Sequence, residues 1–291
     1  MIPREVLRQV RRIEIRTRHL VSDVFGGEYH SVFKGRGMEF SEVREYTPGD
    51  EIRTIDWNVT ARMGHPYVKL FREERELTVI LLVDQSASGA FGTRRRFKAE
   101  LAAEVGALLA LSAVQNNDRV GLVLFTDRVE HFVPPGKGRR HVLRVVREIL
   151  YHRPQGRGTD LRGALDHLSR TQKRRAVVFL LSDFFAEGYE QSLAVASRRH
   201  DVVAMRLRDA REETLPAVGL VALRDLESDR TLLVDTSDRT VRRAFAERAA
   251  QRERSFTAAV RHARVDSVDL WTDRDVVIPL AGFFQQRMRR R

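Results

Sequence analysis

The amino-acid sequence predicts a doubly wound α/β fold, built on a mainly parallel sheet with helices on both faces. Two continuous apolar runs, Leu77–Val83 and Ala176–Leu181, have the length and composition of central strands that are buried on both faces. Between residues 77 and 207, apolar strand-like segments alternate with helical segments. This alternation is typical of parallel strands joined by helical crossovers.

The first 76 residues differ from the rest of the chain. Glu5–Val21 carries apolar residues at helical spacing, which predicts an amphipathic helix that docks on the protein itself or on a partner. From Phe25 to Leu70, glycine turns separate short strand-like segments near 39–46 and 67–71. We therefore expect residues 1–76 to form an N-terminal helix and a β-rich appendage.

Residues 77–215 contain the main predicted domain. Its expected elements after the first strand are a helix at 97–114, strands at 119–125 and 129–133, helices at 140–150 and from residue 161, a strand at 176–181, a helix at 189–199 and a strand at 201–207. Pro134, Pro135 and Gly136 are expected to end the return strand at 129–133.

Residues 216–291 are expected to pack on this core. They predict a hairpin at 218–224 and 231–235, and a long helix Arg239–His262 with Asp238 as its N-cap. A short strand near 268–271 and a final helix near 280–289 follow.

Composition limits the classes of function. The chain has no cysteine, which excludes thiol catalysis, cysteine zinc sites and disulfides. It shows neither the apolar core of a signal peptide nor a run long enough to span a membrane, so we expect a cytoplasmic protein. The net charge of +12 raises nucleic acid as a partner. However, no aromatic residues alternate with the basic ones to form a stacking platform.

Oxygen-bearing side chains follow the two central strands. Asp84, Ser86 and Ser88 come directly after the first strand, and Asp183 follows the strand at 176–181. Thr159 lies in a glycine-flanked loop between them. In a doubly wound sheet these loops meet at the edge where the strand order reverses. Two carboxylates and three hydroxyls suit an octahedral divalent cation that retains water, Mg²⁺ above Mn²⁺ or Ca²⁺, with one coordination position open for a partner's carboxylate.

The pattern Asp84-x-Ser86-x-Ser88, Gly158-Thr159-Asp160 and Ser182-Asp183 resembles the metal-ion-dependent adhesion site of von Willebrand factor A domains. The upstream stretch resembles the signature of the domain-of-unknown-function 58 family, in which such a domain follows. The matching motifs are Lys34-Gly35-Arg36-Gly37-Met38-Glu39-Phe40, Arg44-Glu45-Tyr46-x-Pro48-Gly49-Asp50, Arg53-x-Ile55-Asp56-Trp57 and Ala61-Arg62.

The resemblance implies a von Willebrand A-like, Rossmann-type fold and a non-enzymatic role. Members are typically encoded beside MoxR-type AAA+ ATPases, which implies an adaptor or co-chaperone in protein maturation or complex assembly. The metal would then bind an acidic residue of a client protein. In the upstream motif, we expect ion pairs that tie the appendage to the main domain, with an ATPase docking surface as the alternative. We expect Trp57 to be a packing anchor.

Two other functions remain open from the sequence. A haloacid-dehalogenase-like phosphatase would use Asp84 as its nucleophile, but it needs an acid two residues later, where this chain has Ser86. A nucleic-acid-binding protein would use the basic excess. A catalytic serine is not expected, because Ser86 lacks both a Gly-x-Ser-x-Gly context and an identifiable histidine partner.

Overall fold

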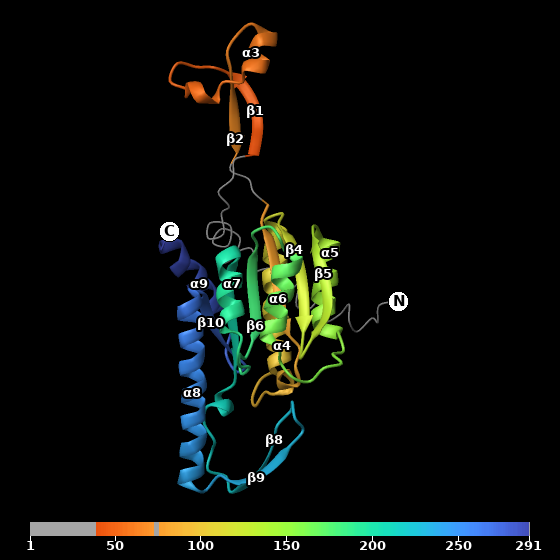
Figure 1. Ribbon diagram of the computed structural model, residues 1–291, viewed down its shortest axis with the longest axis vertical. Helices are drawn as coiled ribbons and strands as arrows, with labels where there is room; N and C mark the ends of the chain where they lie inside the picture. Colours follow the sequence, from red (N-terminus) through yellow and green to blue (C-terminus); the bar gives the residue numbers. More distant parts are fainter. Residues whose placement is uncertain (1–38, 73–75, 291) are drawn as a thin grey trace. The chain divides into compact units, whose positions relative to one another are not determined.

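The computed structural model describes residues 39–72 and 76–290 (Figure 1). The chain divides into two compact units, with the boundary between Leu77 and Thr78. The expected amphipathic helix Glu5–Val21 and the first part of the upstream motif lie outside the described residues. Each unit is described separately.

The smaller unit contains a two-stranded antiparallel sheet. Its strands, β1 (Glu39–Glu45) and β2 (Tyr67–Arg72), lie where the sequence predicts them. The connection contains a 3₁₀ helix, η2 (Ile52–Thr54), and a short helix, α3 (Trp57–Met63), which was not predicted. A helix of seven residues is too short to show apolar periodicity. Its only sequence signals are its two caps.

Asp56 begins α3 as an N-cap, since its side chain accepts hydrogen bonds from the backbone N–H groups of Asn58 (3.0 Å) and Val59 (3.3 Å). Gly64 ends the helix in the left-handed region, with a φ of 75°. Trp57, expected to be a packing anchor, is 66% exposed, so that prediction is wrong.

Ion pairs of the upstream motif form inside this unit. Arg44 makes a bidentate pair with Asp50, with N–O distances of 2.6 and 2.7 Å. The Arg44 hydrogen bond, followed by one from the Thr47 backbone, holds the pKa of Asp50 well below its usual value. Asp56 also pairs with Lys69 at 3.3 Å. Both pairs join residues of the same unit, so they stabilise the appendage itself.

The larger unit is built on a six-stranded sheet in the order β10-β7-β6-β3-β4-β5. Its strands are β3 (Thr78–Asp84), β4 (Arg119–Phe125), β5 (Val129–Gly136), β6 (Val177–Ser182), β7 (Asp201–Arg208) and β10 (Asp266–Trp271). All neighbouring strands are parallel except β4 and β5. From β3 the chain proceeds to β4 on one side, and later returns to β6 on the other side. The predicted doubly wound fold is confirmed, with its reversal point between β3 and β6.

Helices cover both faces of this sheet (Figure 1). They are α4 (Lys98–Gln115), α5 (Arg139–Tyr151), α6 (Leu161–Thr171), α7 (Glu190–Arg199), α8 (Arg239–Ala263) and α9 (Val277–Arg289). On one face, Ile80, Leu82 and Val178 pack with side chains of α6, α7 and α8. Residues that alternate with these, such as Leu81, point to the opposite face, where α4 packs against α5. Both faces of β3 are therefore buried, as its apolar sequence predicts.

The return strand is longer than predicted. Pro134 and Pro135 lie within β5, which continues to Gly136. β5 is the edge strand of the sheet. The N–H that a proline lacks can therefore fall on the side that has no neighbouring strand, and the hydrogen bonds between β4 and β5 are kept. The neighbouring strand accommodates the proline ring, since a Cβ on Gly121 would lie 3.1 Å from Pro135 and 2.8 Å from Ile80.

The C-terminal region supplies one strand of the main sheet and a separate hairpin. β10 pairs in parallel with β7. Among the described residues, the hairpin strands β8 (Leu220–Arg224) and β9 (Thr231–Asp235) pair only with each other, and they lie apart from the sheet in Figure 1. Asp238 caps α8, as the sequence predicts. In the described part of the chain, no helix has both the length and the apolar character needed to cross a membrane.

Acid should destabilise the larger unit through His200, at the end of α7. His200 is 1% exposed, and burial, with smaller contributions from Arg199 and Arg175, lowers its pKa to about 4. In the unfolded chain His200 becomes protonated at a pKa of about 6.5. The contribution of neutral, buried His200 to the free energy of unfolding is therefore complete above that pH and is lost as the pH falls toward 4. The loss should approach about 3 kcal/mol.

Urea unfolding of the wild type and of His200→Leu at pH 7 and pH 5 measures this effect. We expect the wild type to lose more stability than His200→Leu between the two pH values. His262→Leu, which removes an exposed histidine of α8, should behave like the wild type. Equal losses in the wild type and in His200→Leu would contradict the assignment.

Candidate cation site

The candidate site lies at the carboxyl ends of the two central strands. Asp84 is the last residue of β3, and Asp183 directly follows β6. The strands are adjacent and parallel, with Val83 opposite Leu181, so both carboxylates emerge at the same edge of the sheet. This edge is the reversal point of the strand order, where doubly wound folds bind their ligands.

Asp84 is held rigidly and is only 7% exposed. Its Oδ1 accepts the backbone N–H of Ser86 at 2.9 Å, and its Oδ2 accepts the hydroxyl of Ser182 at 2.6 Å. Burial, followed by the nearby charge of Asp183, raises the pKa of Asp84 to about 7. Two carboxylates placed this close together create a site where a cation is favourable.

The two serines after β3 lie beside this carboxylate. Ser86 precedes the 3₁₀ helix η3 (Ala87–Ala90), which contains Ser88. The tight turn of η3 brings the hydroxyl oxygens of Ser86 and Ser88 to 2.8 Å from each other. The sequence predicted that Asp84, Ser86 and Ser88 converge, and the structure brings them together, through a helical turn rather than an extended loop.

Thr159 reaches the same edge on a loop that hydrogen bonds and the close approach of Gly156 hold in place. The Arg157 carbonyl accepts the backbone N–H of Ala87 at 2.9 Å, which joins the loop to η3. The Glu130 carboxylate accepts the backbone N–H of Gly156 at 2.7 Å. A Cβ on Gly156 would lie 2.2 Å from the side chain of Thr126, so only glycine permits this close approach to the end of β4.

The hydroxyl of Thr159 makes no hydrogen bond to Asp84, Ser86, Ser88 or Asp183. Instead it donates to the Oε1 of Glu227, in the turn between β8 and β9, at 2.9 Å. Four of the five predicted site residues therefore lie around the ends of β3 and β6. The fifth, Thr159, is tied to them through its loop and faces a carboxylate that was not predicted.

A buried lysine adds a positive charge to the site. Lys98, the first residue of α4, is 1% exposed and donates to Asp183 Oδ2 and to Glu212 Oε1, both at 2.6 Å. Burial alone would lower the pKa of Lys98, but the charges of Asp183 and Glu212 outweigh it, so the pKa is raised. Asp183 and Glu212 thus share one buried ammonium group at the site.

Sequence reasoning missed Lys98, Glu212 and Glu227. The signal for Lys98 was a lysine at the start of a helix that is otherwise apolar and buried. A charge in such a position requires a buried partner. Glu212 and Glu227 carry no comparable signal, because each is positioned by contacts between distant parts of the chain.

The donor set fits a small divalent cation. In an octahedral Mg²⁺ site, with oxygens about 2.1 Å from the metal, neighbouring ligand oxygens lie about 3 Å apart. The 2.8 Å between the Ser86 and Ser88 hydroxyls is compatible with this spacing. No group of three or more His, Cys, Asp or Glu side chains among residues 39–72 and 76–290 is arranged to hold a metal. Water molecules would therefore complete the coordination of an ion held by the five predicted residues, Asp84, Ser86, Ser88, Thr159 and Asp183.

The same residues are poorly suited to catalysis. The hydrogen-bond partner of the Ser86 hydroxyl is Ser88, and not a histidine that could activate it. The position two residues after Asp84, where a phosphatase of the haloacid-dehalogenase type needs an acid, holds Ser86. The geometry favours binding over proton transfer.

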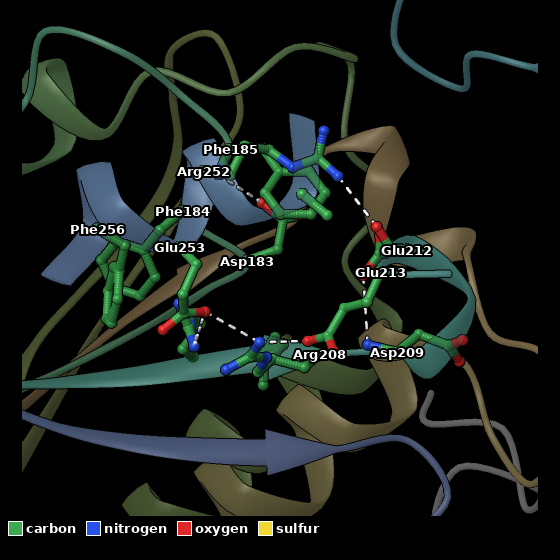
Figure 2. Close-up of a pocket in the computed structure, with 13 residues that line it drawn as sticks. Asp183, Phe184, Phe185, Arg208, Asp209, Glu212, Glu213, Arg252, Glu253 and Phe256 are labelled. Carbon is green, nitrogen blue, oxygen red and sulfur yellow. Dashed lines mark hydrogen bonds and ion pairs between the residues drawn. The ribbon is translucent and has the colours of Figure 1, made fainter. Parts of the chain in front are cut away.

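Beside the site, a cavity of about 40 Å³ lies between Asp183–Phe185 and the arginines of β7 (Figure 2). Its charged residues already pair with one another. Arg206 contacts Glu253 at 2.8 Å and lies over the ring of Phe256, and Arg208 also contacts Glu253. The cavity has room for little more than water, so we assign these residues a structural role.

Two solved structures align with this chain at low similarity. Protein BatB of Bacteroides thetaiotaomicron, a conserved hypothetical protein, is 15% identical, and the match covers 74% of this chain and all of that chain, with a TM-score of 0.47. The SpRpn10 VWA domain is 10% identical, and the match covers 70% of this chain and 92% of that domain, with a TM-score of 0.38.

The chain is also similar to an uncharacterized protein of Mycobacterium tuberculosis. The two are 32% identical over 283 residues, which cover 96% of this chain and 89% of the relative. The family model described as protein of unknown function DUF58 matches residues 42–255, which include the upstream motif from Arg44 to Arg62 and all five predicted site residues. The chain belongs to the DUF58 family.

Proposed function

We propose that this protein is a non-enzymatic interaction module that binds its partner through a divalent cation, with Mg²⁺ as the best fit. The observation that carries the proposal is the pair of buried carboxylates, Asp84 and Asp183, with serine hydroxyls beside them at the reversal point of the sheet. A cation would offset the burial of the Asp84 charge and its repulsion from Asp183, which together raise the pKa of Asp84. Its open coordination position would accept a carboxylate from another protein.

We further propose that the partners are an acidic client protein and a MoxR-type AAA+ ATPase, for which this chain acts as adaptor or co-chaperone. We infer an acidic client because the serine and threonine hydroxyls are neutral ligands, which leave positive charge on the cation to attract a further carboxylate. The ATPase is proposed from the resemblance of the upstream motif. The exposed Ile52, Trp57 and Met63 of the smaller unit offer that ATPase an apolar contact surface.

Cation binding should depend on Asp84. We expect Asp84→Asn to weaken Mn²⁺ binding by more than about 100-fold, because it removes a direct ligand, and even outer-shell changes cost 10–100-fold. Calorimetric titration with Mn²⁺ measures the effect. Asp166→Asn, which removes an exposed carboxylate on α6, is the matched control and should bind like the wild type. Equal Mn²⁺ affinity in Asp84→Asn and the wild type would contradict the site.

Partner binding should depend on the cation. We expect an acidic client protein from the same organism to bind the immobilised protein more strongly in Mg²⁺ than in EDTA. Asp84→Asn should bind equally weakly in both. The measurement is surface plasmon resonance with the purified partner. Identical binding of the wild type with and without EDTA would refute a metal bridge.

Lys98 should stabilise the site when no cation is present. Lys98→Met leaves Asp183 and Glu212 without their buried counter-charge, so we expect the free energy of unfolding to fall by about 3 kcal/mol in EDTA. Because the lysine and the cation share Asp183, millimolar Mg²⁺ should stabilise Lys98→Met more than it stabilises the wild type.

Urea unfolding with and without Mg²⁺ measures both effects. Lys173→Met removes an exposed lysine and should match the wild type under both conditions. If Mg²⁺ stabilised Lys98→Met no more than the wild type, the cation and Lys98 would not share a carboxylate.

A further inference from the structure

The turn of the β8–β9 hairpin places a carboxylate at the candidate cation site. Glu227 is half-buried, and its Oε1 accepts the hydroxyl of Thr159 at 2.9 Å. Its second oxygen, Oε2, lies along the same loop, 3.9 Å from where a Cβ on Gly158 would be. The 2.9 Å separation from Thr159 is close to the spacing of about 3 Å expected for two neighbouring ligands of one Mg²⁺ ion.

The loop of Thr159 places Glu227 beside the site. Thr159, whose hydroxyl donates to Glu227, is one of the five predicted ligands. Its loop is joined to η3, which contains Ser88, by the hydrogen bond from the Ala87 N–H to the Arg157 carbonyl at 2.9 Å. The carboxylate of Glu227 thus lies next to the loop that reaches the ends of β3 and β6.

The turn is preorganised to present this side chain. Asp225 accepts the backbone N–H of Glu227 at 3.0 Å, and its own N–H closes the turn on the Arg230 carbonyl at 2.8 Å. Arg157, two residues before Thr159, donates to the Leu226 carbonyl at 2.9 Å and lies 3.6 Å from the Asp229 carboxylate. The loop of Thr159 therefore contacts the turn at residues on both sides of Glu227.

The rest of the hairpin has little else to hold it. In the part of the chain that the structure describes, its two strands pair only with each other, and an isolated two-stranded hairpin is marginally stable in water. Leu220, Leu232 and Leu233 are 70%, 67% and 67% exposed. The contacts at the tip are therefore well placed to decide where the hairpin lies.

We propose that Glu227 is a carboxylate ligand that the chain supplies to its own cation site, in the position that a partner's acidic residue would otherwise take. This inference rests on the proposed function, because it requires the site to hold a divalent cation. It adds that the cation fixes the hairpin to the site, and that a partner binds by displacing Glu227. The hairpin would then be released from the Thr159 loop when the partner docks.

The test compares Glu227→Gln with Asp235→Asn, which removes an exposed carboxylate from the same hairpin without touching the site. We expect Glu227→Gln to bind Mn²⁺ about tenfold more weakly than the wild type, and Asp235→Asn to bind like the wild type. In hydrogen exchange, Mg²⁺ should slow the amides of residues 225–230 in the wild type and in Asp235→Asn, but not in Glu227→Gln.

Failure of this inference can be distinguished from failure of the proposed function. If the wild type binds Mn²⁺ and Asp84→Asn does not, the site exists. Unchanged Mn²⁺ affinity in Glu227→Gln, an equal loss in Asp235→Asn, or an unchanged effect of Mg²⁺ on exchange at the turn would then overturn the role of Glu227 alone. If the wild type binds no Mn²⁺, both proposals fall together.

Discussion

The charge balance at the ends of β3 and β6 is the constraint on which the site depends. A doubly wound fold brings the carboxyl ends of its two central strands together, and this chain places an aspartate at each. Buried carboxylates at short range repel each other, and each is costly without a counter-charge. Lys98 supplies that charge to Asp183, whereas Asp84 is stabilised only by the neutral donors Ser86 and Ser182. Burial, and then the charge of Asp183, raises the pKa of Asp84, whose hydrogen-bond donors are neutral, so Asp84 has the greater need for a cation.

The supporting contacts explain how flexible loops can hold such a site. The Glu130 side chain of β5 accepts the Gly156 N–H, and the Arg157 carbonyl accepts the Ala87 N–H, so the Thr159 loop is fixed to β5 and to η3. Similarly, Asp209 accepts hydrogen bonds from Thr93 and Thr272, which joins the segment after η3 to the ends of β7 and β10. These contacts involve residues outside the five-donor motif. The motif supplies the oxygens, while the surrounding polar residues determine their positions.

The sequence predicted most of the larger unit because its signals are local. Apolar runs define β3 and β6, the Asp238 cap marks the start of α8, and the residues after each strand identify Asp84 and Asp183. It misplaced the end of β5, because whether a proline breaks a strand depends on the strand's place in the sheet. It could not give Glu212 or Glu227, whose positions depend on how η4 (Ala210–Glu212) and the hairpin pack against segments far away in the sequence.

The composition of the site bears on how cation and partner would act together. Two carboxylates, one of them shared with Lys98, bind a divalent ion less strongly than a site with three. An added carboxylate, from Glu227 or from a partner, strengthens the binding of the ion, and by reciprocity the ion strengthens the binding of that carboxylate. A site with a full set of acidic ligands would hold its ion tightly and leave no position for exchange. The hydroxyl-rich set of ligands in this chain therefore suits reversible binding, because the ion's charge is fully balanced only by a carboxylate that can dissociate.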